Sequence, residues 1–352
     1  MQTNHTYDRR LIVAVTAALV VCVPSVRIAA APRTAEQKQV DAAVSRALKY
    51  LAAQQQPNGS WRAGRYGEST ATTSLAVMAF LSAGHVPGEG PYGRRLNRAI
   101  DWVLAQQQPN GIIVARRSHG PFYSHGISTL MLSEVTGMLA ASRSKRCRQV
   151  LENAVHLILK AQNVPKSRQH AGGWRYRETD TQSDLSVTGW QLLALRAAKD
   201  VGCDVPAESI DRAVAYVRRC RRGRQGFAYM PGGRSSPTLT GVGILSLEVC
   251  GKHKSRDVLT GAAALLRRPL RRRDHYFYYG VYYCSVGMFK VGGRYWKKTR
   301  ASINAILLPS QQTDGSWAAT DGGERVAGGI YSTSMTVLAL AVEYRYLPIY
   351  QR

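Results

Sequence analysis

One stretch near the middle of the chain, residues 172–195, constrains the fold more than any other. It joins a Gly-Gly-Trp turn to a short polar loop and then to an apolar helix that begins at Asp184. Similar units recur on both sides, about 50 to 60 residues apart, a spacing typical of repeat arrays and closed toroids. Several units open with a helix that ends in a Gln-rich turn, as at 54–61, 106–111 and 311–317, whereas the helix over 208–220 ends in an Arg-rich turn.

The helices of each unit are of two kinds. Residues 36–56 place Val40 and Leu48 on one face, whereas residues 69–83 are apolar on almost every side. An amphipathic helix packs on one neighbour, but a helix that is apolar all round has to be enclosed. Because an open array would expose the second kind, we predict an all-α fold, a single (α/α)6 toroid of six helical hairpins with inner and outer helix rings, over residues 36–347.

Hydroxyl residues mark a common register in the inner helices. Similar apolar runs open at Thr73, Thr129, Thr188, Thr240 and Thr333, and Cys284 lies where a missing copy is expected. In this register His125 precedes Thr129 as Asp184 precedes Thr188, so we expect both at one end of the barrel. A His and an Asp that face one pocket are suited to acid–base chemistry. Capping of the inner helices is the alternative role for the residues at this register.

The first 31 residues are typical of a secretory signal. Arg9 and Arg10 precede the uncharged apolar run 11–23, and residues 29–31 offer small side chains for cleavage. The run is shorter than the about 20 residues that span a bilayer. We expect a signal peptide over 1–31, with an N-terminal membrane anchor as the alternative, and therefore export to the periplasm or cell envelope.

The charge balance is strongly basic, with 48 Lys and Arg against 22 Asp and Glu and a formal net charge of +26. Arg-rich runs occupy 143–148, 218–224 and 267–273, at the ends of outer helices or in loops. Such runs are usually solvated surface, but at an envelope they also suit anionic lipid headgroups or cell-wall polyanions. The sequence has no patch of basic and aromatic residues that would stack bases, so no nucleic-acid partner is predicted.

The endings of three outer helices resemble the QW repeats of squalene and oxidosqualene cyclases. These Gln…Gly-x-Trp segments occupy 54–61, 162–174 and 311–317, and we expect Gly59, Gly173 and Gly315 to form equivalent turns with positive φ. The wider array resembles the α/α toroid of terpenoid cyclases and protein prenyltransferases over nearly all of the predicted toroid. That resemblance implies a central cavity for an isoprenoid, although one fold hosts many functions.

The resemblance also indicates where an acid would lie. Class II cyclases protonate an alkene with the middle Asp of an Asp-x-Asp-Asp motif at the start of an inner helix. Here that motif falls on 184–187, where Asp184 is kept and Ser186 replaces the proton donor. Asp180 is the other acid nearby, in the preceding loop. The candidate catalytic residues are therefore Asp184, Asp180 and His125, and helix capping is the alternative for Asp184.

Aromatic residues cluster on the fifth inner helix and precede or follow other inner-helix starts. Rings that line a cavity bind an apolar chain or stabilise a cation, whereas core packing is the alternative. The predicted cavity residues are Trp190, Tyr123, Tyr276, Tyr279 and Tyr283. Prenyltransferases also bind zinc through Asp, Cys and His, but here His275 and Cys284 have no clear Asp partner, so neither a metal nor a cofactor is predicted.

Two functions stay open at this point. The first is a divergent enzyme or binding protein that takes an apolar, isoprenoid-like ligand in the central cavity. The second is a non-catalytic scaffold of the cell envelope that holds a partner with its basic surface. An open aromatic cavity that contains Asp184 and His125 would favour the first, and a plugged centre with a contiguous arginine surface would favour the second.

Overall fold

The computed structural model describes residues 33–115, 118, 120–319 and 321–351. The predicted signal peptide, residues 1–31, lies outside this described part. Residues from Ala35 to Arg352 form one compact unit. None of the helices described in it combines the length and the apolarity needed to cross a bilayer.

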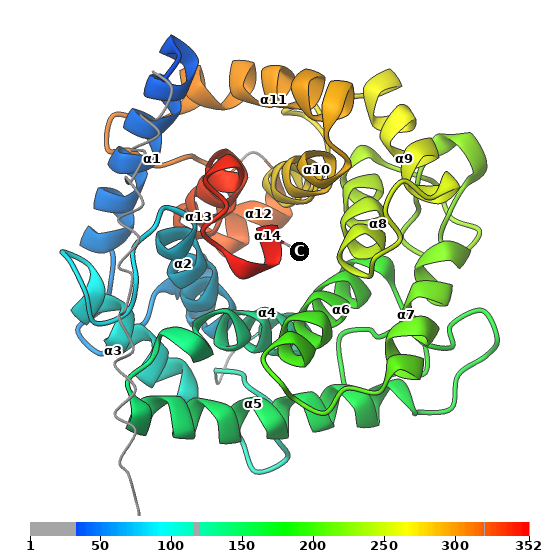
Figure 1. The fold of residues 1–352 in the computed structure, drawn as a ribbon, viewed down its shortest axis with the longest axis horizontal. Coiled ribbons are helices and arrows are strands. Elements are labelled where there is room, and N and C mark those ends of the chain that lie inside the picture. The colour runs from blue at the N-terminus through cyan, green and yellow to red at the C-terminus, as the bar shows by residue number, and fades with distance from the viewer. Residues whose placement is uncertain (1–32, 116–117, 119, 320, 352) are drawn as a thin grey trace, which may run out of the picture. The chain divides into compact units, whose positions relative to one another are not determined.

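This unit consists of two rings of helices, one inside the other (Figure 1). The outer ring contains α1 (Ala35–Ala53), α3 (Gly93–Leu104), α5 (Ala141–Gln162), α7 (Ala207–Arg219), α9 (Arg256–Arg267) and α11 (Gly293–Leu307). The inner ring contains α2 (Thr70–Ser82), α4 (Pro121–Val135), α6 (Leu185–Asp200), α8 (Pro237–Val249), α10 (Phe277–Val291) and α13 (Gly329–Leu340). The last inner helix packs against both α1 and α2, which closes the ring. The predicted toroid of six hairpins is confirmed.

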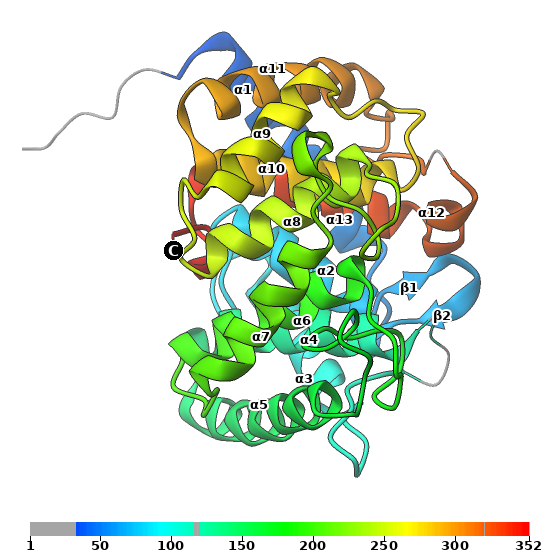
Figure 2. The same ribbon diagram turned by 90° about the vertical axis from the view of Figure 1, so that its right-hand side faces the viewer.

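Short elements decorate the two ends of the toroid. They are β1 (Arg62–Ala63), β2 (Gly67–Glu68), α12 (Gly322–Ala327), α14 (Pro348–Gln351) and the 3-10 turns η1 (Gly64–Tyr66), η2 (Thr136–Met138), η3 (Gly223–Gln225), η4 (Leu308–Ser310) and η5 (Ala341–Tyr344). The strands pair antiparallel. Figure 2 shows β1, β2 and α12 at one end of the toroid and the C-terminus at the other.

The two rings differ in burial as the hydrophobic patterns predict. In α2 every residue except Ala71 is buried, and in α8 every residue except Leu239 is buried. The outer helix α3 instead buries a stripe that includes Leu96, Ile100 and Val103 and leaves its arginines outside. The hydrophobic core therefore lies between the rings and inside the inner ring.

One turn geometry joins outer helices to inner helices around the ring. At the end of α11, the Gln311 amide donates to Gly315 O of its own turn (2.9 Å) and to Ala43 O of α1 (2.8 Å). Trp317 donates from its indole to Leu307 O (2.9 Å) and from its backbone to Thr333 Oγ1 (3.1 Å). The same bridge from a glutamine to its own turn and to the next outer helix is made by Gln55 to Arg95 O, Gln107 to Val150 O and Gln162 to Ser209 O. Four of the six hairpins are thereby tied to their successors among the described residues.

The turn geometry corrects the predicted register of the second inner helix. Ile113 stands where the first, third and sixth turns have tryptophan and the fourth has Phe227, and its N–H donates to His125 Nδ1 (3.1 Å). In the first and third hairpins the matching acceptors are Thr73 and Thr188. His125 therefore replaces the threonine, and the alignment on Thr129 was wrong by about one helical turn. The apolar run of this helix continues for another turn, so Thr129 occupies a similar place in the sequence pattern to the register threonines of the other inner helices.

The turn glycines lie against the backbone of the next outer helix. Gly59 and Gly315 have φ of +95° and +90°, as predicted, but in the third turn the positive φ (+86°) belongs to Gly172 and not to Gly173. A Cβ on Gly315 would lie 2.5 Å from Arg46 O, and one on Gly172 would lie 2.3 Å from Arg212 O. These glycines are required both by conformation and by contact.

We expect Gly315→Ala to lower the free energy of unfolding by about 3 kcal/mol, because left-handed strain adds to the displacement of α1. Gly232→Ala is the matched control, since Gly232 has a φ of +83° but no atom within 4 Å of the added Cβ. Its cost should stay near 1 kcal/mol. Urea unfolding followed by circular dichroism measures both. Equal costs would show that the contact with Arg46 contributes nothing.

Candidate functional site

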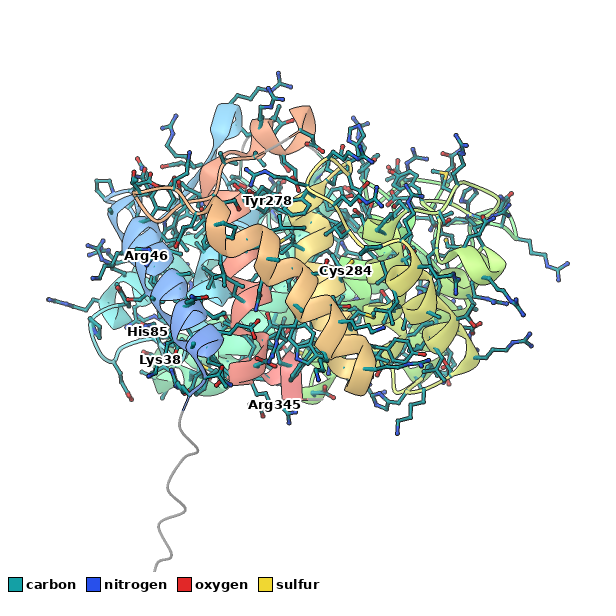
Figure 3. All side chains as sticks on the ribbon, turned by 90° about the horizontal axis from the view of Figure 1, so that it is seen from above. Lys38, Arg46, His85, Tyr278, Cys284 and Arg345 are labelled. Atoms are coloured by element: carbon teal, nitrogen blue, oxygen red, sulfur yellow. The ribbon has the colours of Figure 1, made fainter. Side chains whose placement is uncertain are left out.

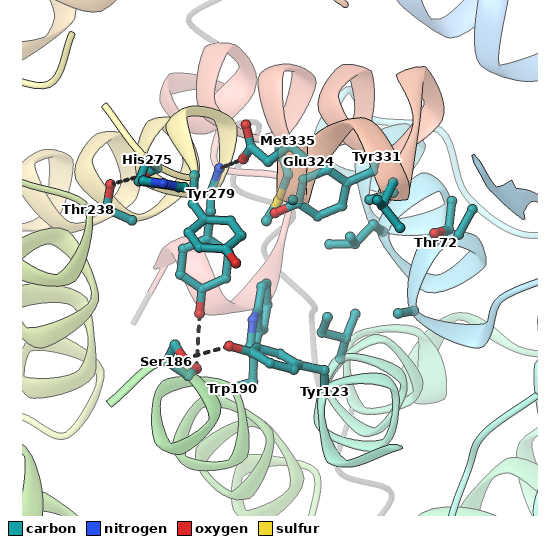
Figure 4. Close-up of a pocket in the computed structure, with 18 of the residues that line it drawn as sticks. Thr72, Tyr123, Ser186, Trp190, Thr238, His275, Tyr279, Glu324, Tyr331 and Met335 are labelled. Carbon is teal, nitrogen blue, oxygen red and sulfur yellow. Dashed lines mark hydrogen bonds between the residues drawn. The ribbon is translucent and has the colours of Figure 1, made fainter. Parts of the chain in front are cut away.

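A cavity of about 860 Å3 opens at the N-terminal ends of the inner helices (Figure 4). Its lining residues on the inner helices all lie within the first two turns, from Ala71 and Leu75 on α2 to Tyr331 and Met335 on α13. The loops between outer and inner helices, together with α12, form the rim. The cavity is thus built from the same end of every hairpin.

Side chains and the C-terminal segment fill the opposite end of the inner ring. The Trp190 ring stacks on Tyr282, with centroids 5.4 Å apart and an interplanar angle of 6°. Beyond these rings, α14 lies within the inner ring in Figure 1. Its Tyr350 is buried and donates to Leu338 O (3.0 Å), and Ile349 N–H donates to Glu134 Oε2 (3.0 Å). In the view of Figure 3, Tyr278 near the mouth and Arg345 beside α14 mark the two ends.

Asp184 reaches the cavity only through Ser186. The carboxylate is fully buried and caps α6 by accepting from Val187 N–H (2.9 Å). Ser186 donates to the same oxygen (2.6 Å) and accepts from the Tyr123 hydroxyl (2.5 Å). Burial raises the pKa of Asp184, and the bonds from Ser186 and Val187 oppose that rise. Ser186 therefore lies on the cavity wall, with its hydroxyl committed to two partners.

The other two candidate catalytic residues lie elsewhere. Asp180 accepts from Arg177 N–H (3.0 Å) and closes a turn of its loop. His125 is fully buried between Ile113 N–H and Ala154 O, and burial lowers its pKa to about 4. Its imidazole is accordingly neutral and serves the turn of the second hairpin. The structure does not bring Asp184, Asp180 and His125 together in one pocket.

Four of the five predicted cavity residues line the cavity, namely Trp190, Tyr123, Tyr276 and Tyr279. The fifth, Tyr283, lies behind them, with its ring 4.8 Å from that of Tyr279 and 5.3 Å from that of Trp190. Burial holds the pKa of Tyr123 and of Tyr279 well above the usual value, so both hydroxyls stay protonated at neutral pH. The Tyr279 hydroxyl donates to Ser186 O (3.0 Å).

Sequence reasoning missed Glu324, a buried carboxyl on the cavity wall. It belongs to α12 and accepts from Tyr279 N–H at Oε1 (2.9 Å) and from Tyr278 N–H at Oε2 (3.2 Å). Tyr276, which precedes α10 with a φ of +54°, provides no side-chain cap, so Glu324 caps α10 from another segment. Burial raises its pKa to about 7 against the opposing bonds from Tyr279 and Tyr278. No local signal reveals such a cap, because the residues it joins are far apart in sequence.

The polar groups of the site do not assemble into a metal centre. Within the described ranges, no group of three or more His, Cys, Asp and Glu side chains converges as metal ligands would. His275 Nδ1 lies 3.2 Å from Asp321 Oδ2 at the rim, while Cys284 is buried in α10 with Sγ 3.5 Å from Pro237 O. What the arrangement offers is an aromatic and aliphatic wall with paired hydroxyls, charged side chains toward the mouth, and the carboxyl of Glu324, whose pKa burial raises to about 7.

Two family models match the chain. The squalene-hopene cyclase C-terminal domain matches residues 19–113, and the prenyltransferase alpha-alpha toroid domain matches residues 127–275. Each model covers less than half of the chain, and over these residues the chain is similar to both families. No curated protein matches this toroid protein in sequence.

Solved structures with the same fold carry different functions. A variant of the type II terpene cyclase MstE from Scytonema, in complex with geranylgeranyl dihydroxybenzoate, has a TM-score of 0.58 and 14% identity, over 89% of this chain and 99% of its own. A glycosidase variant in complex with glucose has a TM-score of 0.64 and 12% identity. The match covers 90% of this chain and 100% of the glycosidase. An inactive α-1,6-mannanase of Salegentibacter sp., in complex with α-1,6-mannotetrose, has a TM-score of 0.61 and 9% identity. The match covers 86% of this chain and 99% of the mannanase. At these identities the likeness shows the fold alone.

The raised pKa of Glu324 predicts a pH-dependent stability. Because the folded carboxyl binds its proton more tightly than the unfolded one, its contribution is complete below 4.5, the usual pKa of a glutamate, and declines as pH rises to about 7. The free energy of unfolding of the native toroid, minus that of Glu324→Gln, should therefore fall by about 3 kcal/mol over this window. Urea titrations at several pH values measure the difference. A pH-independent difference would show that the folded carboxyl has an ordinary pKa.

Proposed function

We propose that this toroid protein binds an apolar, isoprenoid-like ligand in the central cavity. The carrying observation is a cavity of about 860 Å3, closed at its inner end by stacked aromatic rings and lined on its walls by apolar side chains. Small-molecule sites are concave, largely apolar pockets of roughly 300 to 1,000 Å3. The cavity is within that range.

The wall chemistry favours a chain of hydrocarbon over a polar ligand. Leu75, Ile127 and Met335 supply aliphatic surface, and the rings of Trp190 and Tyr279 supply aromatic surface. Branched alkenyl units gain by burial against such surfaces without needing hydrogen bonds. Aromatic faces also interact favourably with any positive charge on the ligand.

The hydroxyls around the cavity are largely committed within the protein. Tyr123 and Tyr279 bond to Ser186, and the hydroxyls of Tyr176 and Tyr229 bond to each other (2.5 Å). A sugar would have to replace these partners, since buried hydroxyls left unpaired cost free energy. This pairing supports an isoprenoid, as in the MstE complex, over the sugars held by the glycosidase relatives of the fold.

The proposal concerns binding. Proton-initiated cyclisation from the position of Ser186 is not part of it, because a serine hydroxyl is too weak an acid to protonate an alkene. Glu324 is the carboxyl of the described cavity wall whose pKa is raised to about 7, but its oxygens cap α10. Export through residues 1–31 stays a prediction, and we place the binding function in the cell envelope on that basis.

We expect the protein to bind geranylgeraniol and Ala71→Trp to weaken that binding at least tenfold, about 1.4 kcal/mol, because an indole at Ala71 fills the cavity. Ala42→Trp is the matched control, since Ala42 is exposed on α1. Titration calorimetry in detergent below its micelle concentration measures the affinities. Thermal unfolding of both variants checks that each is folded.

Two results would contradict the proposal. One is a protein that binds neither geranylgeraniol nor any lipid that mass spectrometry detects in the purified sample. The other is tighter binding of α-1,6-mannotetrose than of geranylgeraniol, which would assign the cavity to a carbohydrate.

A further inference from the structure

Exposed arginines surround the mouth of the cavity. We call Arg65, Arg177, Arg224, Arg271, Arg272 and Arg273 the arginine rim; they come from four of the loops that join outer helices to inner helices. Each of these loops also contributes lining residues to the cavity: Arg65, Tyr176, Tyr229 and His275 are examples. Arg65 itself lines the cavity, and the other five arginines lie in loops that supply lining residues.

The charges of the rim are not neutralised by the protein. None of the six guanidinium groups lies within ion-pair distance of a carboxylate in the described part of the chain, where the arginine ion pairs involve other residues. Two carboxylates in the same loops accept hydrogen bonds from backbone N–H groups of their own turns. Asp180 accepts from Arg177 N–H and Asp274 accepts from Arg271 N–H, both from the backbone. A cluster of like charges without counter-ions is sustained most readily when an anionic partner completes it.

The residue types of the rim are those that bind phosphate groups and lie at the interface between water and hydrocarbon. All of its cations are arginine, whose planar fork pairs bidentately with phosphate. The lysine of these loops, Lys166, is turned inward and donates to Ala161 O (2.9 Å). Tyr276 stands at the mouth with half of its surface exposed, and the Arg65 guanidinium lies 5.7 Å above the Tyr66 ring. Tyrosine and arginine side by side are typical of bilayer interfaces.

We propose that the arginine rim docks the cavity mouth onto a bilayer surface rich in anionic phospholipids. Such a surface offers an array of phosphates to the rim and places hydrocarbon opposite the apolar opening. A soluble polyanion would satisfy the arginines but would leave Tyr276 and the open cavity without a counterpart. The inference stands on the rim and holds whether or not the cavity takes an isoprenoid.

The test compares two charge-reversal variants of the full chain. Arg271→Glu/Arg272→Glu/Arg273→Glu alters the rim. Arg294→Glu/Lys297→Glu/Lys298→Glu makes the same change of charge on exposed residues at the start of α11, at the opposite end of the toroid. Co-sedimentation with phosphatidylglycerol–phosphatidylcholine vesicles and with pure phosphatidylcholine vesicles measures binding. Residues 1–34 are common to all proteins, so their contribution cancels.

We expect the rim variant to bind the anionic vesicles roughly a hundredfold more weakly, since each of its three basic residues near an anionic surface contributes a factor of about five. The α11 variant should stay within about threefold of the native protein, and binding should weaken as salt increases. A second rim variant, Arg65→Glu/Arg177→Glu/Arg224→Glu, should reproduce the loss from different loops. That agreement excludes misfolding of one loop as the cause.

Three results would overturn the inference. They are an equal loss in the α11 variant, unchanged vesicle binding in both rim variants, and binding of inorganic polyphosphate without binding of either vesicle. The last would assign the rim to a soluble polyanion. Geranylgeraniol affinity is measured on the same variants, so a failed docking surface is distinguished from a failed ligand proposal.

Discussion

The structure depends on one repeated interaction, the glutamine amide that bridges two carbonyls at the end of an outer helix. One carbonyl belongs to its own turn and the other to the next outer helix, as Gln311 shows with Gly315 and Ala43. The bridge needs the turn glycine, because any Cβ at that position would meet the backbone of the neighbour. Since the fourth such bridge runs from the last hairpin to the first, the same contact that adds one hairpin to another also closes the ring.

A closed ring of like hairpins places all inner helices parallel, and this sets the chemistry of the two ends. At the mouth, free N–H groups need acceptors, which explains why buried carboxylates gather there as caps, Asp184 on α6 and Glu324 on α10. At the other end, free carbonyls need donors. Arg196 Nε donates to Val249 O (3.1 Å) and the Tyr350 hydroxyl donates to Leu338 O (3.0 Å). Polar residues of the site are thus helix caps first, and any role toward a ligand is added to that one.

How much the sequence predicts follows from the range of each interaction. The hairpins, the two kinds of helix and the turn tryptophans are local patterns, and they were predicted well. His125 was assigned to the mouth because its apolar run extends one turn further, and only its bond from Ile113 reveals its true register. Glu324 was not predicted, because the N–H groups that it caps lie 45 and 46 residues earlier in the chain. The same holds for α14, whose insertion into the ring depends on Glu134 in a helix far back in the chain.

The asymmetry of the ends also bears on the choice between a binding protein and a scaffold. A protein that acts only through its outer surface does not need an interior cavity. At the end opposite the mouth, the segment α14 fills the centre of the inner ring. Tyr350 and Ile349 are buried there, whereas the same radius at the mouth is left open between Leu75, Ile127 and Met335. Apolar side chains that line a cavity lack packing partners on one side, and the loss of stability grows with the volume of the cavity. The two proposals meet at this end of the ring, because hydrocarbon would be buried against the apolar walls and an anionic surface would pair with the arginine rim.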